Sequence, residues 1–306
     1  MKSTEEIAGK FLGKKVEGKS TYDKSFLVAV PRQENRTYLG YSDDKYPDGF
    51  DTWYGYEFTT LTESGLPVNR VIKIMYPSSS KYIVESKSLK LYLNTYAMTR
   101  LGSTRELALE KAREMIEQDL TELLGTTIAI SFIDENSTQV RLFRYYNDLY
   151  DMVENVDDLS ITEYNENKDL LTLEQDHLPH KYIHRYAFYS LKSNCRVTHQ
   201  PDFGDIFIYY NSNVKISEES LIKYLCSFRN EYHFHEEIVE CCFKRLSDIL
   251  NPDDELIVTA LYTRRGGIDI NPCRYQNLSD EIVEIERLNA LKEQGVFTRF
   301  AANIKQ

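Results

Sequence analysis

The hydrophobic pattern predicts the same order of elements twice along the chain, and this duplication constrains the fold more than any other feature. In the first half, residues 51–60 and 69–76 alternate apolar and polar side chains, as half-buried strands do. A stripe of apolar side chains at helical spacing follows, and residues 126–134 and 139–145 then alternate again. The first half is therefore predicted to hold two strands, a helix and two further strands.

The second half has the same order of elements. Strands are predicted at residues 182–192 and 205–210, two amphipathic helices follow, and strands return at 255–262 and 268–270. Two strands, helices and two strands make an α+β unit, in which hairpins give an antiparallel sheet with helices on one face.

We therefore expect an α+β protein with two tandem domains, residues 1–165 and 166–306, each an antiparallel sheet with helices on one face. The chain of 306 residues is long enough for two ordinary domains. The join is expected in the acid-rich segment 151–176. The halves share an order of elements, while their residues show no obvious repeat.

Capping residues predict where the helices begin and end. Ser103 followed by Glu106 has the spacing of a capping box, and Gly125 is a suitable stop for that helix. Ser217 is expected to cap the first helix of the second half.

Charge and composition limit the classes of partner and compartment. The formal net charge of −11 argues against a nucleic-acid surface, because such a surface needs Lys and Arg against phosphates. The N-terminal segment has no apolar core of signal-peptide length, and no stretch has the roughly 20 apolar residues of a membrane span. The five cysteines make a poor disulfide framework. We expect a cytoplasmic protein without direct nucleic-acid or membrane contact.

Two motifs that match well-known patterns are rejected. Residues 13–20 fit the P-loop pattern, but no buried strand precedes them and no helical pattern follows. His177, His180 and His184 have metal-ligand spacing, but Pro179 breaks the helix that would bring them to one face. No metal site is predicted.

The segment 190–204 has the composition of a reactive turn. It is a polar, turn-rich break after an apolar strand, and it contains Cys195 followed seven residues later by Asp202. A cysteine at a strand end with a nearby carboxylate suits a nucleophile with a proton-transfer partner. From composition alone, a buried free cysteine is the commoner explanation.

Three further polar segments have both a functional and an ordinary interpretation. Residues 234–236 place a His and a Glu at a helix start, where the Glu could also serve the helix dipole. Residues 84–92 precede a helix whose backbone donors, with Lys87 and Lys90, would suit a phosphate. Residues 263–272 form a basic, glycine-containing turn that could grip a phosphate or simply join two strands.

Taken together, these segments resemble the long, two-domain form of the 7-cyano-7-deazaguanine reductases, the nitrile reductases of queuosine biosynthesis. The matching runs, in the family's order, are Glu85-Ser-Lys-Ser-Leu-Lys-Leu-Tyr92, Lys192-Ser-Asn-Cys195, Thr198-His-Gln-Pro-Asp202, Phe234-His-Glu236 and Arg264-Arg-Gly-Gly-Ile-Asp-Ile-Asn-Pro272. The resemblance covers nearly the whole chain and favours Cys195 as a nucleophile. It implies tandem tunnelling-fold domains and assembly into oligomers, which we expect to be a homodimer.

The resemblance also implies a reaction. Cys195 would attack the nitrile carbon of 7-cyano-7-deazaguanine to give a thioimide, and Asp202 would supply a proton to the nitrogen. Two hydrides, one from each of two NADPH molecules, would complete the reduction to the aminomethyl product. Because a carboxylate opposes a thiolate, we expect nearby cations such as Arg196 or Lys192 to favour the thiolate form of Cys195.

By the same resemblance, Glu85 and Glu236 would hold the guanine-like edge of the substrate through charge-assisted hydrogen bonds. The remaining substrate contacts would come from Val84, Ser86 and His235. The residues implied to meet NADPH are Ser86, Lys87, Arg265 and Gly266. Because these segments come from both halves, we expect the two halves to build one site.

Two other functions remain open at this stage. The first is a tunnelling-fold pterin or purine hydrolase or cyclohydrolase, for which a zinc set would be the discriminating feature. The second is a purine-binding module without catalytic activity, which would form no adduct with the substrate.

Overall fold

A computed structural model describes residues 4–10, 14–15, 17–42, 45–133, 143, 145–174 and 178–278 of the chain. Its dominant feature is one nine-stranded sheet. From one edge to the other, its strands are β5 (Ala129–Ile133), β3 (Pro67–Pro77), β2 (Asp48–Leu61), β11 (Ile268–Gln276), β10 (Glu255–Tyr262), β8 (Pro201–Ser212), β7 (Tyr182–Cys195) and β6 (Asn147–Asp148), with β9 (Tyr232–His233) also on β7.

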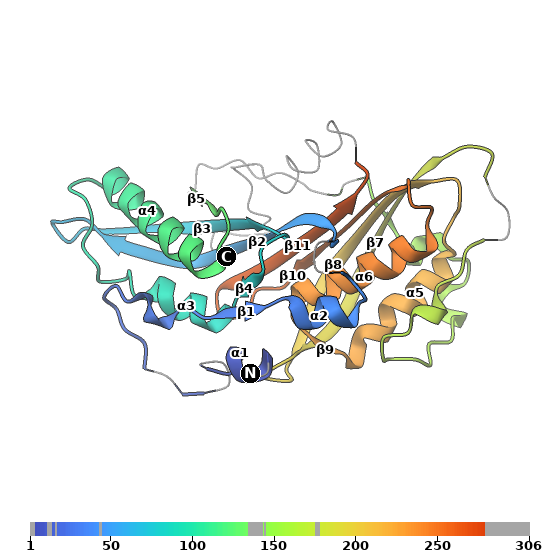
Figure 1. The fold of residues 1–306 in the computed structure, drawn as a ribbon, viewed down its shortest axis with the longest axis horizontal. Helices are drawn as coiled ribbons and strands as arrows, with labels where there is room; N and C mark the ends of the chain where they lie inside the picture. Colours follow the sequence, from blue (N-terminus) through green and yellow to red (C-terminus); the bar gives the residue numbers. More distant parts are fainter. Residues whose placement is uncertain are drawn as a thin grey trace.

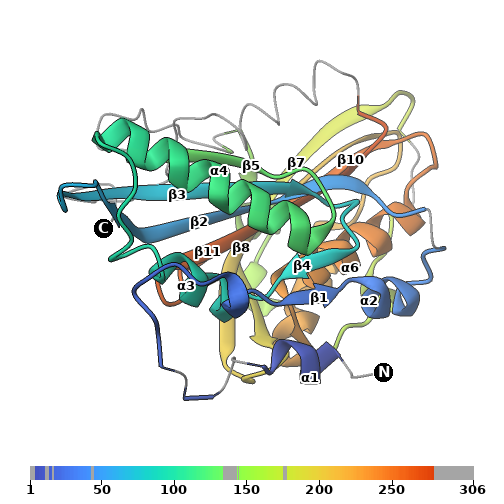
Figure 2. The same cartoon turned by 60° about the vertical axis from the view of Figure 1, so that its left-hand side comes forward.

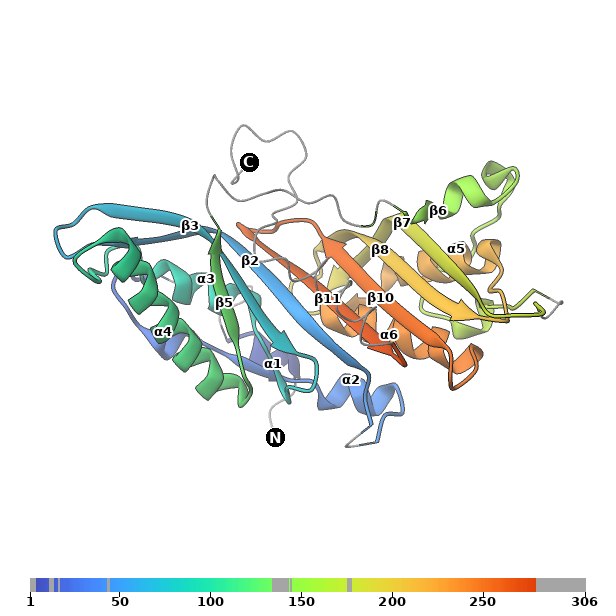
Figure 3. The same cartoon turned by 90° about the horizontal axis from the view of Figure 1, so that it is seen from above.

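The two halves share this sheet, which runs unbroken from one to the other (Figure 3). Strand β2 of the first half pairs with β11 of the second half, in antiparallel register from Gly55 opposite Ile268 to Asp48 opposite Tyr275. The expected antiparallel arrangement is confirmed for the long strands, while the two-residue strands β6 and β9 pair in parallel with β7. The expectation of one sheet in each half is refined, because the two sheets are joined edge to edge.

The helices cover one face of the sheet, as predicted (Figures 1 and 2). They are α1 (Thr4–Ala8), α2 (Gln33–Tyr38), α3 (Ser86–Asn94), α4 (Arg105–Leu124), α5 (Glu218–Cys226) and α6 (His235–Ile249). Helices α3 and α4 enclose a core that includes Tyr92 and Ile116, and α5 and α6 enclose a second core that includes Phe188 and Ile238. Each half thus has its own hydrophobic core on the same side of a common sheet.

Short elements complete the described fold. The strands β1 (Ala29–Pro31) and β4 (Tyr82–Val84) form a separate antiparallel pair. Five short 3-10 turns are η1 (Lys24–Phe26), η2 (Leu149–Met152), η3 (Val156–Asp158), η4 (Lys168–Leu170) and η5 (Ser227–Asn230).

The predicted helix boundaries hold with one correction. Helix α4 is capped by Thr104, whose hydroxyl accepts a hydrogen bond from Leu107 N at 3.2 Å, and not by Ser103 as predicted. Either residue type can serve as an N-cap, so composition alone left the choice open by one position. Gly125 ends α4 in the left-handed conformation with φ 63°, and Ser217 caps α5, both as predicted.

The acid-rich segment expected to be a linker packs against the second half. Leu171 is buried in the second core, and Val156 and Ile161 pack against it. The predicted domain boundary at residue 165 therefore falls in a segment that packs against the second core, and it stays a prediction. Of the strand predicted at 139–145, Phe143 and Tyr145 lie in turns and the rest lies outside the described residues.

None of the helices in the described part of the chain combines the length and the apolar character that a membrane crossing requires.

Candidate functional site

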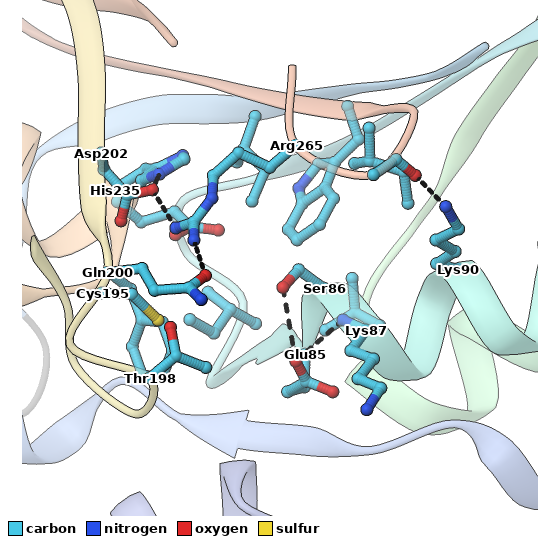
Figure 4. Close-up of a pocket in the computed structure, with 18 of the residues that line it drawn as sticks. Glu85, Ser86, Lys87, Lys90, Cys195, Thr198, Gln200, Asp202, His235 and Arg265 are labelled. Carbon is cyan, nitrogen blue, oxygen red and sulfur yellow. Dashed lines mark hydrogen bonds and ion pairs between the residues drawn. The ribbon is translucent and has the colours of Figure 1, made fainter. Parts of the chain in front are cut away.

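A cavity of about 290 Å³ lies between the helix-covered halves of the sheet and is lined by residues of both. All ten predicted site residues line it: Val84, Glu85, Ser86, Lys87, Cys195, Asp202, His235, Glu236, Arg265 and Gly266. Figure 4 shows Cys195, Asp202 and His235 on one side of the cavity, with Glu85, Ser86 and Lys87 facing them from the other. The predicted residues therefore share one cavity, whose size is close to that of small-ligand pockets.

The β7–β8 hairpin positions the predicted nucleophile and carboxylate. Cys195 ends β7 and Pro201 begins β8, so the two segments are separated by a short turn. Hydrogen bonds from Cys195 N to Gln200 O at 2.8 Å and from His199 N to Cys195 O at 3.0 Å close this turn. Asp202 lies on the neighbouring strand opposite Ser193. The hairpin thus brings residues seven apart in sequence to one end of the cavity.

Asp202 is buried and has two cationic or protonatable partners. Its Oδ1 atom is 3.3 Å from His235 Nε2 and also accepts a hydrogen bond from the guanidinium group of Arg265. The other end of that guanidinium donates to Gln200 Oε1 at 2.6 Å. Burial raises the pKa of Asp202, but hydrogen bonding and charge from His235 and Arg265 lower it more, so the pKa lies below its ordinary value. In this state Asp202 is a carboxylate.

His235 is the first residue of α6 and has contacts on its ring face and at its Nε2 atom. Its ring stacks on Tyr262 with centroids 3.7 Å apart and an interplanar angle of 5°. This stacking and the contact with Asp202 fix the ring orientation, which leaves the Nδ1 atom buried without a hydrogen-bond partner among the described residues. His235 can therefore orient Asp202 and still offer one ring nitrogen to a ligand.

The two cations predicted to favour the Cys195 thiolate have different kinds of partner. Arg196 forms ion pairs with Glu5 at 2.5 Å, Glu34 at 2.7 Å and Glu237 at 2.9 Å. Lys192 donates to Asn194 Oδ1 at 2.8 Å. Three carboxylates compensate the charge of Arg196, whereas the acceptors of Lys192 are neutral, so the expected effect of a nearby cation on Cys195 stays a prediction. Sequence proximity alone did not reveal these distant partners.

Glu85 caps its own helix at the opposite wall of the cavity. Its carboxylate accepts hydrogen bonds from Lys87 N at 2.8 Å and Ser88 N at 2.7 Å. The backbone donors that were expected to suit a phosphate are therefore occupied by Glu85, which corrects that expectation. Burial raises the pKa of Glu85 above its ordinary value, although the backbone hydrogen bonds from Lys87 and Ser88 oppose the rise.

Glu236 faces the same cavity from the first turn of α6. The neighbouring Glu237 performs the capping role, since its carboxylate accepts from Phe234 N at 2.9 Å. Glu236 is 2% exposed, and its Oε1 atom has no hydrogen-bond partner among the described residues. Burial, with the charge of Asp51, raises the pKa of Glu236 to about 8. Its free acceptor atom suits a ligand with an N–H donor.

A group of cations lines the outer part of the cavity. Lys87 Nζ donates to Lys14 O at 2.5 Å, and Lys90 Nζ lies 3.1 Å from Glu57 while also donating to Gly266 O. The latter contact ties α3 to the β10–β11 turn, where Gly266 has φ 59°. A side chain at this glycine would be strained and would approach Lys90. These cations and the exposed turn have the chemistry to receive a phosphorylated cofactor.

Sequence reasoning missed several cavity residues. Trp53 and Ile270 come from the paired strands β2 and β11, and Gln200 and Thr198 come from the turn after Cys195. Gln200 and Thr198 were inside the 190–204 segment and could have been named from it. Trp53 had no local signal, because only the β2–β11 pairing brings it to the site.

Among the described residues, no group of three or more His, Cys, Asp or Glu side chains is arranged to hold a metal ion. His177 lies outside the described residues. Cys241 and Cys242 are both buried in the second core, where cysteine serves as a small hydrophobic side chain.

Two family models match this chain on either side of the acid-rich segment. The model described as nitrile reductase, 7-cyano-7-deazaguanine-reductase N-term, matches residues 18–132, and the model described as QueF-like protein matches residues 201–280. A curated relative from Colwellia psychrerythraea is 35% identical over 275 residues, covering 89% of this chain and 93% of the relative. One from Cupriavidus taiwanensis is 37% identical over 265 residues, covering 86% and 91%. Both relatives are named NADPH-dependent 7-cyano-7-deazaguanine reductase.

Proposed function

Because the chain belongs to the family of NADPH-dependent 7-cyano-7-deazaguanine reductases, we propose that the cavity between its halves is the site where the nitrile is reduced. The function is the NADPH-dependent reduction of 7-cyano-7-deazaguanine to 7-aminomethyl-7-deazaguanine in queuosine biosynthesis. The observation that carries the site assignment is the convergence of all ten predicted residues on one cavity.

Cys195 is the nucleophile in this proposal. Its sulfur forms a bond to the nitrile carbon, one bond of the C≡N group becomes a lone pair on nitrogen, and that nitrogen takes up a proton. The thiol loses one proton in the same step, so no net proton is consumed. A nitrile is a weak electrophile, and a cysteine paired with a proton-transfer group is suited to attack it.

Asp202 is the proton-transfer group. A carboxylate with a lowered pKa is a poor initial acid, but it can accept the thiol proton of Cys195 and then pass it to the nitrile nitrogen. Its position on the strand beside Cys195, and its contact with His235, support this role. The proton that Asp202 supplies is then the one that Cys195 released.

The guanine-like edge of the substrate lies between Glu85 and Glu236. Both carboxyl groups are buried, line the cavity and have raised pKa values, so each is costly to ionise without a partner. A ring that presents several N–H donors would stabilise both as carboxylates through charge-assisted hydrogen bonds. Val84, Ser86 and His235 complete the contacts with the substrate.

NADPH is the cofactor, and it supplies hydride when bound. The residues that would hold it are Ser86, Lys87, Arg265 and Gly266 at the outer part of the cavity. Arg265 pairs with Asp202 in this structure, so a phosphate that attracts Arg265 would draw its charge away from Asp202. Losing this cation raises the proton affinity of Asp202 and favours the transfer described above.

Arg265→Ala is expected to raise the KM for NADPH by roughly tenfold or more, because a guanidinium–phosphate contact is lost. Covalent loading of Cys195 by substrate in the absence of NADPH should change much less. Steady-state kinetics give the first quantity, and intact-mass measurement of the adduct gives the second. Equal use of NADH and NADPH by the unmodified protein would contradict the role of Arg265 in binding the phosphate that NADPH has and NADH lacks.

The reductase and a hydrolase are separated by one assay. Incubation with 7-cyano-7-deazaguanine and NADPH should oxidise two NADPH molecules for each aminomethyl product, measured by absorbance and mass spectrometry. The comparisons favour neither the cyclohydrolase nor the purine-binding module. Product without NADPH oxidation would overturn the assignment.

The assembly and the compartment are further proposals. We propose a homodimer in the cytoplasm that does not contact nucleic acid directly, on the family resemblance and the net charge of −11. Sedimentation of the purified protein measures the assembly, and a monomer at working concentration would exclude the dimer.

A further inference from the structure

A network of five buried charged side chains lies beside the substrate cavity. Asp51 accepts hydrogen bonds from Arg32 and from Arg274 Nη1, the latter at 2.7 Å. Glu240 accepts hydrogen bonds from Arg274 Nε at 3.1 Å and from Arg36 Nη2 at 2.9 Å. All five residues are at most 5% exposed. Burying such charges is costly unless they pair with good geometry.

The network joins elements that are distant in sequence. Arg32 and Arg36 come from the segment around α2, Asp51 comes from β2, Glu240 comes from α6, and Arg274 comes from β11. Figures 1 and 2 show α2 and α6 side by side, as the Arg36–Glu240 ion pair requires. The network therefore links the first half of the chain to the second half, next to the pairing of β2 with β11.

The charges of this network do not cancel. Three guanidinium groups face two carboxylates, so one positive charge is left over within the set. Two of the arginines also keep unused donors, since Arg32 Nε and Arg274 Nη2 are buried without a hydrogen-bond partner among the described residues. The missing negative charge must come from a neighbouring group or remain unbalanced.

Glu236 is placed to supply that charge. It lies four residues before Glu240 on α6, so the two side chains share one face of the helix, with Glu240 in the network and Glu236 at the cavity. Ionised Glu236 would make three carboxylates for three guanidinium groups. The charges of Asp51, Arg32 and Arg274 all act on Glu236, the first opposing its ionisation and the other two favouring it.

We propose that burial and the charge of Asp51 keep Glu236 protonated in the free enzyme, and that Arg32 and Arg274 are positioning residues whose charge allows it to ionise when a ligand with N–H donors enters the cavity. The inference rests on the proposed function, because it takes Glu236 as a substrate-binding residue. Substrate binding then releases a proton, and the buried charges become balanced only in the complex. A purine-like ring without these donors would leave Glu236 protonated and bind weakly.

Other titratable groups lie around Glu236 and can affect its ionisation. They are Tyr76 on β3, Tyr262 on β10, His235 and Glu240 on its own helix, and Glu85 and His233 at the cavity wall. The raised pKa values of Tyr76 and Tyr262 keep both tyrosines neutral near pH 7. The variants below therefore alter Arg32 and Asp51, whose charges act directly on Glu236.

The test measures how the affinity for 7-cyano-7-deazaguanine depends on pH. Trp53 is the single tryptophan of the chain and lines the cavity, so quenching of its fluorescence reports binding. All variants carry Cys195→Ala, which prevents covalent loading. Because Glu236 must lose a proton before the ligand binds tightly, raising the pH should lower the dissociation constant about tenfold per pH unit until the pH reaches the pKa of Glu236 in the free protein. Above that pH the dissociation constant should level off, and we call the pH of this change the break.

The charge variants should move this break in opposite directions. Asp51→Asn removes an anion that opposes ionisation of Glu236, so the break should shift to lower pH by about one unit or more. Arg32→Gln removes a cation that favours ionisation, so the break should shift to higher pH. Asp254→Asn is the control, since Asp254 is equally buried but pairs with Lys181 at 2.9 Å outside the cavity lining, and it should leave the break unchanged.

A second measurement needs no change in the network. Calorimetry of substrate binding to the Cys195→Ala protein, in buffers of different ionisation heat, should detect release of about one proton near pH 7. Binding without proton release overturns the inference even if the network variants do not fold.

The inference and the proposed function fail in different ways. If Glu236→Gln leaves affinity unchanged, the assignment of Glu236 to the substrate is wrong. If Glu236→Gln weakens binding but Asp51→Asn and Arg32→Gln keep the parent's break, the site stands and the role of the network is wrong.

Discussion

Cys195→Ala is expected to abolish the covalent adduct with 7-cyano-7-deazaguanine and to lower turnover by on the order of 10³-fold or more. The methyl group of alanine cannot form the thioimide, and the nitrile is too weak an electrophile to accept hydride readily without it. Intact-mass measurement after incubation with substrate, in the absence of NADPH, reads the adduct directly.

Cys226→Ala provides the matched control. Cys226 is also a free, half-buried cysteine of the second half, and burial raises the pKa of its thiol. It does not line the cavity, so its removal should leave the adduct intact. An adduct that survives Cys195→Ala, or disappears in Cys226→Ala, would show that the nucleophile has been misassigned.

Asp202→Asn should lower turnover by roughly 10²- to 10⁴-fold while leaving non-covalent substrate affinity nearly unchanged. Asparagine keeps the shape of the side chain and one oxygen that can accept from Arg265, but it cannot carry a proton between Cys195 and the nitrile nitrogen. Turnover is measured by NADPH oxidation, and affinity by Trp53 fluorescence in the Cys195→Ala background.

Asp205→Asn is the control for this variant, because Asp205 lies three residues further along β8 and outside the cavity lining. It should retain the parent's turnover. Near-normal turnover in Asp202→Asn would mean that the proton comes from another group, with His235 the next candidate because its ring contacts the same carboxylate.

The sequence by itself determined much of the local structure, and the resemblance of its motifs to a family supplied the proposed chemistry. Alternation of side chains identified the long strands, and Gly125 and Ser217 marked helix ends, because these signals depend on residues that are neighbours in the chain. The reactive residues were named from the resemblance of short runs to a family, because composition alone favoured an ordinary buried cysteine at position 195, and their roles stay predictions. Thr104 caps α4 where Ser103 was predicted, because a rule based on residue type cannot choose between two adjacent hydroxyl residues.

Only the tertiary structure decided which charges meet. Arg196 follows Cys195 in the chain, yet its charge is compensated by Glu5, Glu34 and Glu237, which no local pattern could connect to it. The pairing of β2 with β11 made one sheet from two predicted ones and brought Trp53 to the cavity.

The protonation states of the site belong to the tertiary structure as well. A pKa depends on burial and on charges within a few ångströms, and those neighbours are chosen by packing and not by sequence distance. The raised pKa of Glu236 and the lowered pKa of Asp202 therefore arise only when helix α6, the β7–β8 hairpin and the β10–β11 turn come together around one cavity.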